Sequence, residues 1–210
     1  MSKVSRRIKK FEKLSVESIK NALRLHKDSI LLFENKSYPS AYQLSVLSLE
    51  EIAKSGWIDH YVDVSTTNNG LPEPDGEDEQ NWIKLLYIHT SKHFAFINQN
   101  FHSLDKEFYD FASTSNLEFK KQKSIYVGLE RERRKINTKS KILIPTKQIK
   151  QKDASEIIAL NNQCLLNQCL NNINNEHYYG PYEKYTILNT DLLNELKKKW
   201  KIKSKLLKGK

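Results

Sequence analysis

The sequence predicts an all-α protein: a helical bundle with a small β-hairpin excursion and an extra C-terminal helix. The chain of 210 residues has only six Gly and five Pro, so it is poor in the residues that end helices. Its apolar residues recur at helical spacing along most of the chain, and short runs of β type occur between residues 124 and 145. These observations favour long helices with one local interruption.

Two long helices are predicted first. Apolar residues at helical spacing cover residues 15–34, and Ser15 is suited to cap the start of this helix. A second helix is predicted over residues 38–61, with Pro39 tolerated in its first turn. It is apolar on more than one face, which is typical of a helix at the centre of a bundle. The short link between the two helices predicts antiparallel neighbours.

The rest of the chain continues this pattern with one change of period. A polar loop is predicted at residues 64–80. The segments "SIYVGLE" and "KILIP" flank the charged "RERRKINTKS" and predict a small hairpin from residues 124–130 and 141–145. Further helices are predicted at residues 81–101, 103–114, 152–174 and 191–200.

These elements predict five parts of the chain. They are a basic N-terminal tail (1–14), a four-helix bundle (15–119), a basic hairpin arm (120–150), C-terminal helices that pack on the bundle (151–200) and a basic C-terminal tail (201–210).

The net charge of +10 is unevenly distributed. Residues 120–152 hold twelve basic residues and two acids, and residues 197–210 hold eight lysines and no acid. Such segments suit phosphate backbones, although lysine-rich ends are also commonly just solvated. The candidate nucleic-acid contacts are Lys84, Arg131, Arg133, Arg134 and Lys135.

Several classes of protein are disfavoured by the sequence. No apolar run approaches the roughly 20 residues that cross a bilayer, and no apolar region follows the basic N-terminus as in a secretory signal, so we expect no membrane partner. Glycine-rich phosphate loops are absent. Cys164 and Cys169 are interpreted as buried, reduced thiols.

Six polar residues on the second and third predicted helices have spacings that place them on shared faces. They are Glu50, Glu51 and Lys54 on the second helix and His89, Lys92 and His93 on the third. If the helices pack antiparallel, carboxylates, lysines and imidazoles meet at one seam. Either they form a structural polar network or they form a functional site. We predict no metal and no other cofactor, because H-E-x-x-H is absent and no further ligand lies at fixed spacing.

These residues also carry a resemblance to a known family. The segment 48–54, "SLEEIAK", followed one helix later by His89-Thr90-Ser91-Lys92, resembles AbiV-type abortive infection proteins of the HEPN superfamily. Tyr126-Val127 and Pro145 match later features of that family, so the resemblance covers most of residues 15–175. It implies a HEPN-like four-helix bundle, an antiviral role in the bacterial cytoplasm and a homodimer.

One departure from the superfamily concerns its ribonuclease motif, R-x(4–6)-H. The nearest match here is Lys84-x4-His89, in which lysine keeps the charge and loses the planar fork that grips phosphate. The resemblance therefore supports the family more strongly than it supports RNA cleavage.

Two functions remain open. In the first, the protein is an anti-phage effector that acts on RNA or the translation machinery as a metal-independent ribonuclease. His89 is then the acid or base, Lys54 and Lys92 hold phosphate, and Glu50 or Glu51 orients a cation or the imidazole. In the second, it is a non-catalytic module that binds RNA or protein and blocks a phage or host factor. Exposure of His89 discriminates between them, because a catalytic imidazole must be reachable.

Overall fold

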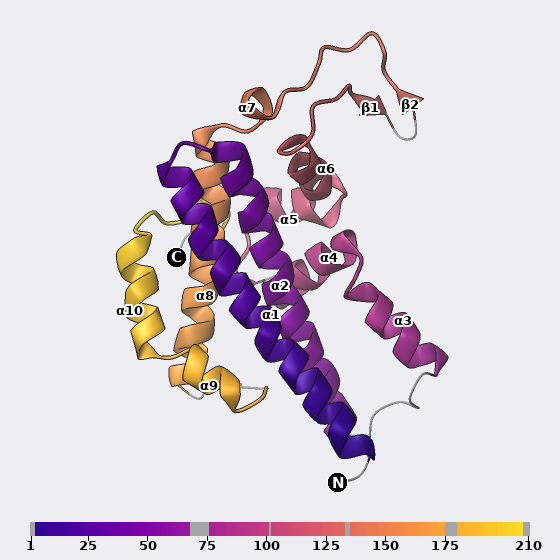
Figure 1. Ribbon diagram of the computed structural model, residues 1–210, viewed down its shortest axis with the longest axis vertical. Helices are drawn as coiled ribbons and strands as arrows, with labels where there is room; N and C mark the ends of the chain where they lie inside the picture. The colour runs from indigo at the N-terminus through magenta and orange to yellow at the C-terminus, as the bar shows by residue number, and fades with distance from the viewer. Residues whose placement is uncertain (1–2, 68–75, 101, 133–134, 175–179, 208–210) are drawn as a thin grey trace.

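A computed structural model of the protein describes residues 3–67, 76–100, 102–132, 135–174 and 180–207. These residues form ten helices and one short antiparallel hairpin. α1 (Lys3–Glu34) and α2 (Tyr38–Thr67) are long antiparallel neighbours, and α8 (Gln151–Ile173) lies alongside them (Figure 1). The all-α prediction is confirmed. Within the described ranges, no helix is long and apolar enough to cross a membrane.

The turn between α1 and α2 is tight. Lys36 has a φ of 60°, and its amide donates to the Phe33 carbonyl at 2.9 Å. The Ser37 amide donates to the Leu32 carbonyl, also at 2.9 Å. These two bonds satisfy carbonyls at the end of α1, as in the usual left-handed helix termination. The turn reverses the chain and places α2 against α1.

Ser15 does not cap α1, which begins twelve residues earlier at Lys3, so that prediction is wrong. Instead, Ser15 is buried inside the helix, and its hydroxyl lies 3.0 Å from the Ser55 hydroxyl and also donates to Asp59 on α2. Small hydroxyl side chains let the two helices approach closely and satisfy each other's polar groups. The helix extends upstream because Phe11 is buried against α2 residues such as Tyr61.

The predicted third helix is two helices. α3 (Glu77–Leu85) and α4 (His89–Asn100) are separated by a break at residues 86–88, where Leu86 is buried while Tyr87 is exposed. The break lets Trp82 of α3 stack on Tyr61, with ring centroids 3.8 Å apart. It also makes His89 the first residue of α4 rather than a residue within a continuous stripe.

The predicted fourth helix corresponds to α5 (Lys106–Ser113), and a further helix that was not predicted, α6 (Asn116–Lys123), follows it. Asp105 caps α5 by accepting a hydrogen bond from the Glu107 amide. A new helix follows directly and lies against α2 and α4, whereas the sequence predicted an end near residue 114. The extra helix adds charged side chains to the α2–α4 seam.

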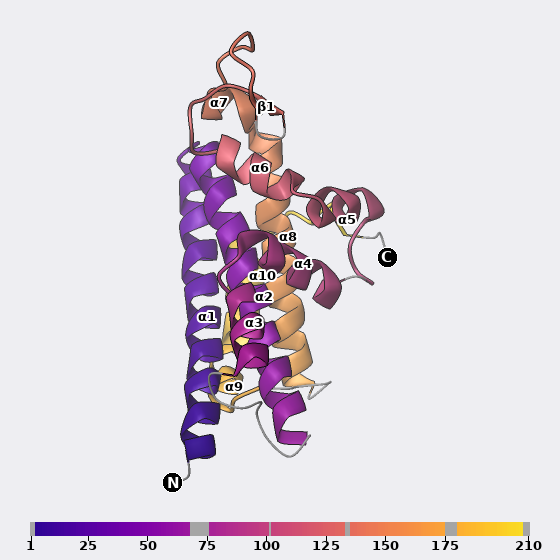
Figure 2. The ribbon, with the colours of Figure 1, turned by 90° about the vertical axis from the view of Figure 1, so that its right-hand side faces the viewer.

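The arm lies beyond the bundle end where α1 and α2 connect (Figures 1 and 2). Its strands, β1 (Arg131–Glu132) and β2 (Lys135–Ile136), are short and antiparallel. The predicted strand segments meet at a single bridge between Gly128 and Leu143. The hairpin is therefore present, but its ladder lies nearer the tip than the sequence predicted. α7 (Pro145–Gln148) leads from the arm into α8.

Two C-terminal helices complete the fold. α10 (Thr190–Lys199) lies against α8 and agrees with the predicted helix within one residue at each end. α9 (Glu183–Ile187) was not predicted. Lys184 of α9 forms a buried ion pair with Asp59 of α2, which ties the C-terminal part of the chain to the bundle. Burial raises the pKa of Asp59 and lowers the pKa of Lys184.

Candidate functional site

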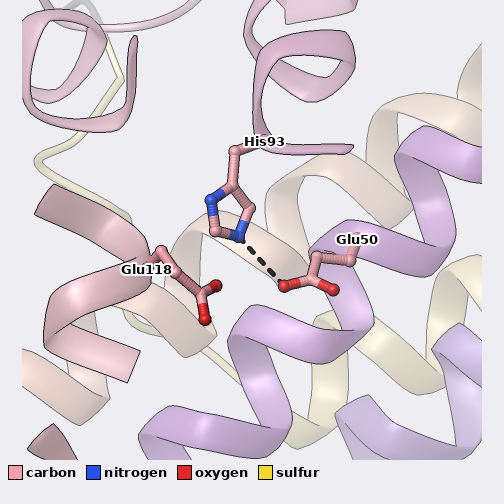
Figure 3. A group of neighbouring side chains, drawn as sticks. All are labelled: Glu50, His93 and Glu118. Carbon is pink, nitrogen blue, oxygen red and sulfur yellow. Dashed lines mark hydrogen bonds and ion pairs between the residues drawn. The ribbon is translucent and has the colours of Figure 1, made fainter. Parts of the chain in front are cut away.

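A buried carboxylate on α2 collects four donors from two other helices. Glu50 is fully buried, and its Oε2 lies 2.6 Å from His89 Nδ1 and 3.0 Å from Lys92 Nζ. Its Oε1 lies 3.0 Å from His93 Nε2 and 2.7 Å from Lys121 Nζ. We call these five residues the Glu50 cluster. Figure 3 shows Glu50 and His93 facing each other across the α2–α4 seam.

The donors hold Glu50 in its ionised form. Burial by itself raises the pKa of this carboxyl, but the hydrogen bonds from His93 and Lys121 and the charges of Lys121 and Lys92 bring it far below its usual range. An ionised carboxylate can only accept hydrogen bonds. The imidazole nitrogens facing it, His89 Nδ1 and His93 Nε2, therefore carry hydrogens.

The two histidines differ sharply in exposure. The His93 side chain is 3% exposed, whereas the His89 side chain is 49% exposed. The Nδ1–H of His89 donates to Glu50, which leaves Nε2 as the free lone pair when the imidazole is neutral. His89 is thus an accessible imidazole whose tautomer and orientation are set by a buried carboxylate.

A second carboxylate is joined to the cluster through Lys121. Lys121 Nζ lies 2.7 Å from Glu50 Oε1 and 2.7 Å from Glu118 Oε2, so its ammonium lies between the two acids. Burial raises the pKa of Glu118, but the hydrogen bonds from Lys121 and Gln122 and the charge of Lys121 together outweigh it and lower the pKa. The two lysines that pair with Glu50 and the two glutamates balance in charge, which makes the buried arrangement tolerable.

The described residues also contain a set of the kind that binds metals. Ligand atoms of Glu50, His93 and Glu118 lie within 4.8 Å of one another (Figure 3). The ammonium of Lys121 contacts both of these carboxylates, so a protein cation already takes the place where a metal ion would be held. The set therefore fits a charge-balanced network better than a metal centre.

The predicted site residues divide into two groups. Glu50, His89 and Lys92 come together as the spacing of the motifs suggested. Glu51 and Lys54 instead pair with each other at 3.2 Å, one turn apart on α2, and among the described residues neither forms a hydrogen bond or ion pair with Glu50 or the α4 histidines. Neighbouring helix positions differ in direction by about 100°, so Glu50 and Glu51 cannot both face α4.

The predicted nucleic-acid contacts lie apart from the cluster along the chain. Lys84 is exposed near the end of α3, and Lys135 is exposed in β2. Arg131 belongs to β1, and Arg133 and Arg134 lie outside the described residues.

Sequence reasoning missed Lys121 and Glu118 as members of the site. They share a face of α6, because residues three apart on a helix are neighbours. That spacing could have shown that they pair, but nothing local indicates that α6 lies against Glu50, 71 residues away.

This is a helical bundle in which Glu50 of the E-E-x-x-K motif meets His89 and Lys92 of the H-x-x-K motif between α2 and α4, and such a bundle is of the HEPN type. Residues 10–166, more than half of the chain, match the HEPN_AbiV family model, described as AbiV, and the chain belongs to this family. Membership implies a role in abortive infection, a defence against phage. No curated protein and no solved structure matches the chain.

Proposed function

We propose that this protein is an anti-phage effector that acts on RNA in the cytoplasm of infected bacteria, with His89 as the residue that transfers protons. The observation that carries the proposal is the Glu50–His89 pair: a buried carboxylate 2.6 Å from an imidazole that is half exposed. A structural network alone needs no exposed imidazole, whereas a general base must be reachable.

The chemistry needs no metal. With Nδ1–H donated to Glu50, His89 Nε2 takes the proton from a ribose 2′-hydroxyl, and the 2′-oxygen attacks the adjacent phosphorus. The bond from phosphorus to the 5′-oxygen breaks, the leaving oxygen takes a proton from water, and the imidazolium returns its proton to the hydroxide formed. Glu50 stabilises the imidazolium during the step. Lys92, whose ammonium lies 3.0 Å from Glu50, would offset the charge that develops on the phosphate oxygens.

The basic arm supplies the second part of the proposal. Residues 120–152 hold twelve basic residues and two acids, and the basic residues other than the buried Lys121 would hold the RNA backbone without reading its sequence. We further propose that two copies of the chain pair as a homodimer, for which molecular mass in solution, measured by light scattering, is the direct test.

The experiment compares His89→Ala with a control variant, His60→Ala. The control removes an exposed histidine of α2 that lies outside the Glu50 cluster. Wild type and both variants are produced at equal levels, and phage plating, RNA cleavage by the purified proteins and thermal melts are measured together. We expect His89→Ala to lose cleavage and protection with a melting temperature close to wild type, and His60→Ala to keep all three. A stable His89→Ala protein that still protects would remove His89 from the mechanism.

A second candidate is a non-catalytic module that blocks a phage or host factor by binding it. The observation that favours it is the burial of the rest of the cluster: the side chains of Lys92, His93 and Lys121 are 11%, 3% and 5% exposed. The lysine at the position of the ribonuclease motif's arginine, Lys84, also favours this non-catalytic candidate, because lysine lacks the planar group that grips phosphate. This candidate expects protection to follow the amount of folded protein and to be independent of any RNA cleavage.

A further inference from the structure

A pocket of about 340 Å³ lies beside the Glu50 cluster, between α2, α3 and α4. Its apolar walls include Trp57 of α2, Leu85 of α3 and Phe94 of α4. The volume is at the lower end of the range of about 300–1,000 Å³ that small-molecule sites occupy, so it suits one ring system rather than a helix or a duplex.

The pocket and the Glu50 cluster share a residue. Lys92 lines the pocket, and its ammonium lies 3.0 Å from Glu50 Oε2, the oxygen that also accepts from His89. Lys54, which the sequence predicted as a phosphate contact, lines the same pocket. The pocket thus combines apolar walls with two lysines, and Lys92 joins it to the Glu50 carboxylate that also accepts from the exposed His89.

The aromatic walls differ in how firmly they are held. Trp57 stacks on Trp82 with ring centroids 6.1 Å apart and planes 16° from parallel, and Trp82 in turn stacks on Tyr61. Trp57 is therefore a fixed wall. Phe94 is 53% exposed, which is a large apolar surface to leave in water beside a pocket. A planar ring bound in the pocket would cover part of it.

The polar side of the pocket is the first turn of α4. Thr90 and Ser91 line the pocket, and their amides belong to the turn whose N–H groups have no intrahelical acceptor. The preceding residue, Ile88, accepts from the Lys92 amide through its carbonyl at 3.1 Å but has no side-chain acceptor to cap the turn. Together with Lys54 and Lys92, this turn favours an anion at the mouth of the pocket.

We propose that this pocket binds the base of one unpaired nucleotide, with the nucleotide's phosphate held by Lys92 and the first turn of α4. Apolar and aromatic walls take a base by stacking, and lysines with the amides of a helix N-terminus take its phosphate. A base that is paired and stacked in a duplex cannot enter. On the proposed function, the substrate is therefore RNA that is single-stranded at the nucleotide beside His89.

The proposal extends the proposed function, but it is tested without RNA cleavage. The full-length protein is titrated by calorimetry with the four nucleoside 5′-monophosphates, with the nucleosides and with inorganic phosphate. We expect at least one monophosphate to bind more tightly than its nucleoside and than phosphate alone. Phosphate binding as tightly as every nucleotide, or no nucleotide binding at millimolar concentration, would overturn the proposal.

Phe94→Ala tests the site, and Phe119→Ala is its matched control, because both rings are about half exposed and Phe119 does not line this pocket. Loss of one aromatic face should weaken nucleotide binding about tenfold in Phe94→Ala and leave it unchanged in Phe119→Ala. Ser91→Leu, which fills the pocket from α4, should block nucleotide binding without removing a wall. Equal affinities in wild type and all three variants would refute the assignment.

The two proposals fail in different ways. Nucleotide binding that is sensitive to Phe94→Ala, in a protein that cleaves no RNA, supports the pocket and refutes the proposed reaction. RNA cleavage that depends on His89 but is unaffected by Phe94→Ala and Ser91→Leu refutes the pocket and leaves the reaction intact.

Discussion

The sharpest expectation concerns two adjacent glutamates on α2. Glu50 is fully buried and has four cationic or imidazole donors, whereas Glu51 pairs only with Lys54 among the described residues, and both side chains of that pair are partly exposed. Glu50→Gln removes the charge and keeps the shape, which leaves the buried Lys92 without its counter-charge and Lys121 with Glu118 alone. Breaking a buried ion pair costs about 3–5 kcal/mol, whereas a surface pair contributes about 0–1 kcal/mol.

For a domain of this size, each kcal/mol shifts the melting temperature by roughly 2–4 °C. Glu50→Gln should therefore lower the melting temperature at pH 7 by roughly 6–20 °C, and Glu51→Gln by roughly 4 °C or less. Differential scanning calorimetry of the three proteins measures both shifts. A Glu50→Gln protein no less stable than Glu51→Gln would refute the view that Glu50 is the electrostatic centre of the fold.

The pH dependence gives a second check on the same residue. The folded-state pKa of Glu50 lies below its unfolded value, so its stabilising effect is present above the unfolded pKa and is lost as pH falls toward the folded pKa. An unfolded glutamate has a pKa of about 4.3. The stability gap between wild type and Glu50→Gln should be full at pH 7 and shrink below about pH 4. A gap that is unchanged at pH 3 would contradict this account.

Two further expectations concern the arm and the cysteines. RNA affinity, measured by fluorescence anisotropy, should fall steeply as the salt concentration rises, and replacing Arg131, Arg133 and Arg134 with glutamine should make this dependence weaker. An affinity that does not change with salt concentration would contradict a role for the arm in RNA binding. Burial raises the pKa of Cys164 to about 12 and that of Cys169 to about 11. Iodoacetamide at pH 8 should therefore modify neither thiol in the native protein, whereas it should modify both thiols in protein unfolded with guanidinium, as measured by mass spectrometry. Rapid alkylation of the native protein would contradict the burial of the thiols.

The local spacing of residues in the sequence was sufficient to predict many of the helices of this protein. Helical periodicity predicted α8 and α10 within one residue at each end and the start of α2, because a long amphipathic or fully apolar run has one way to bury its surface. α2 continues six residues past its predicted end, into the predicted polar loop. The spacing within each motif also predicted that Glu50, Glu51 and Lys54 lie opposite the α4 histidines, and of these Glu50 contacts both imidazoles. Where local signals compete, the predictions failed. The sequence around Ser15 predicts a helix cap, but Ser15 lies inside α1, because its hydroxyl forms hydrogen bonds with α2 rather than with the start of its own helix.

The tertiary structure alone decided which charges belong to the site. Glu50 and Glu51 are equivalent in the sequence, and only the packing of α4 and α6 on one side of α2 makes Glu50 the buried partner of Lys92 and Lys121. Lys121 lies 71 residues from Glu50 along the chain, and no periodicity links positions on separate helices. The physical reason is that a helix determines the direction of each side chain locally, whereas the partner it meets depends on how separate helices bury their apolar faces against one another.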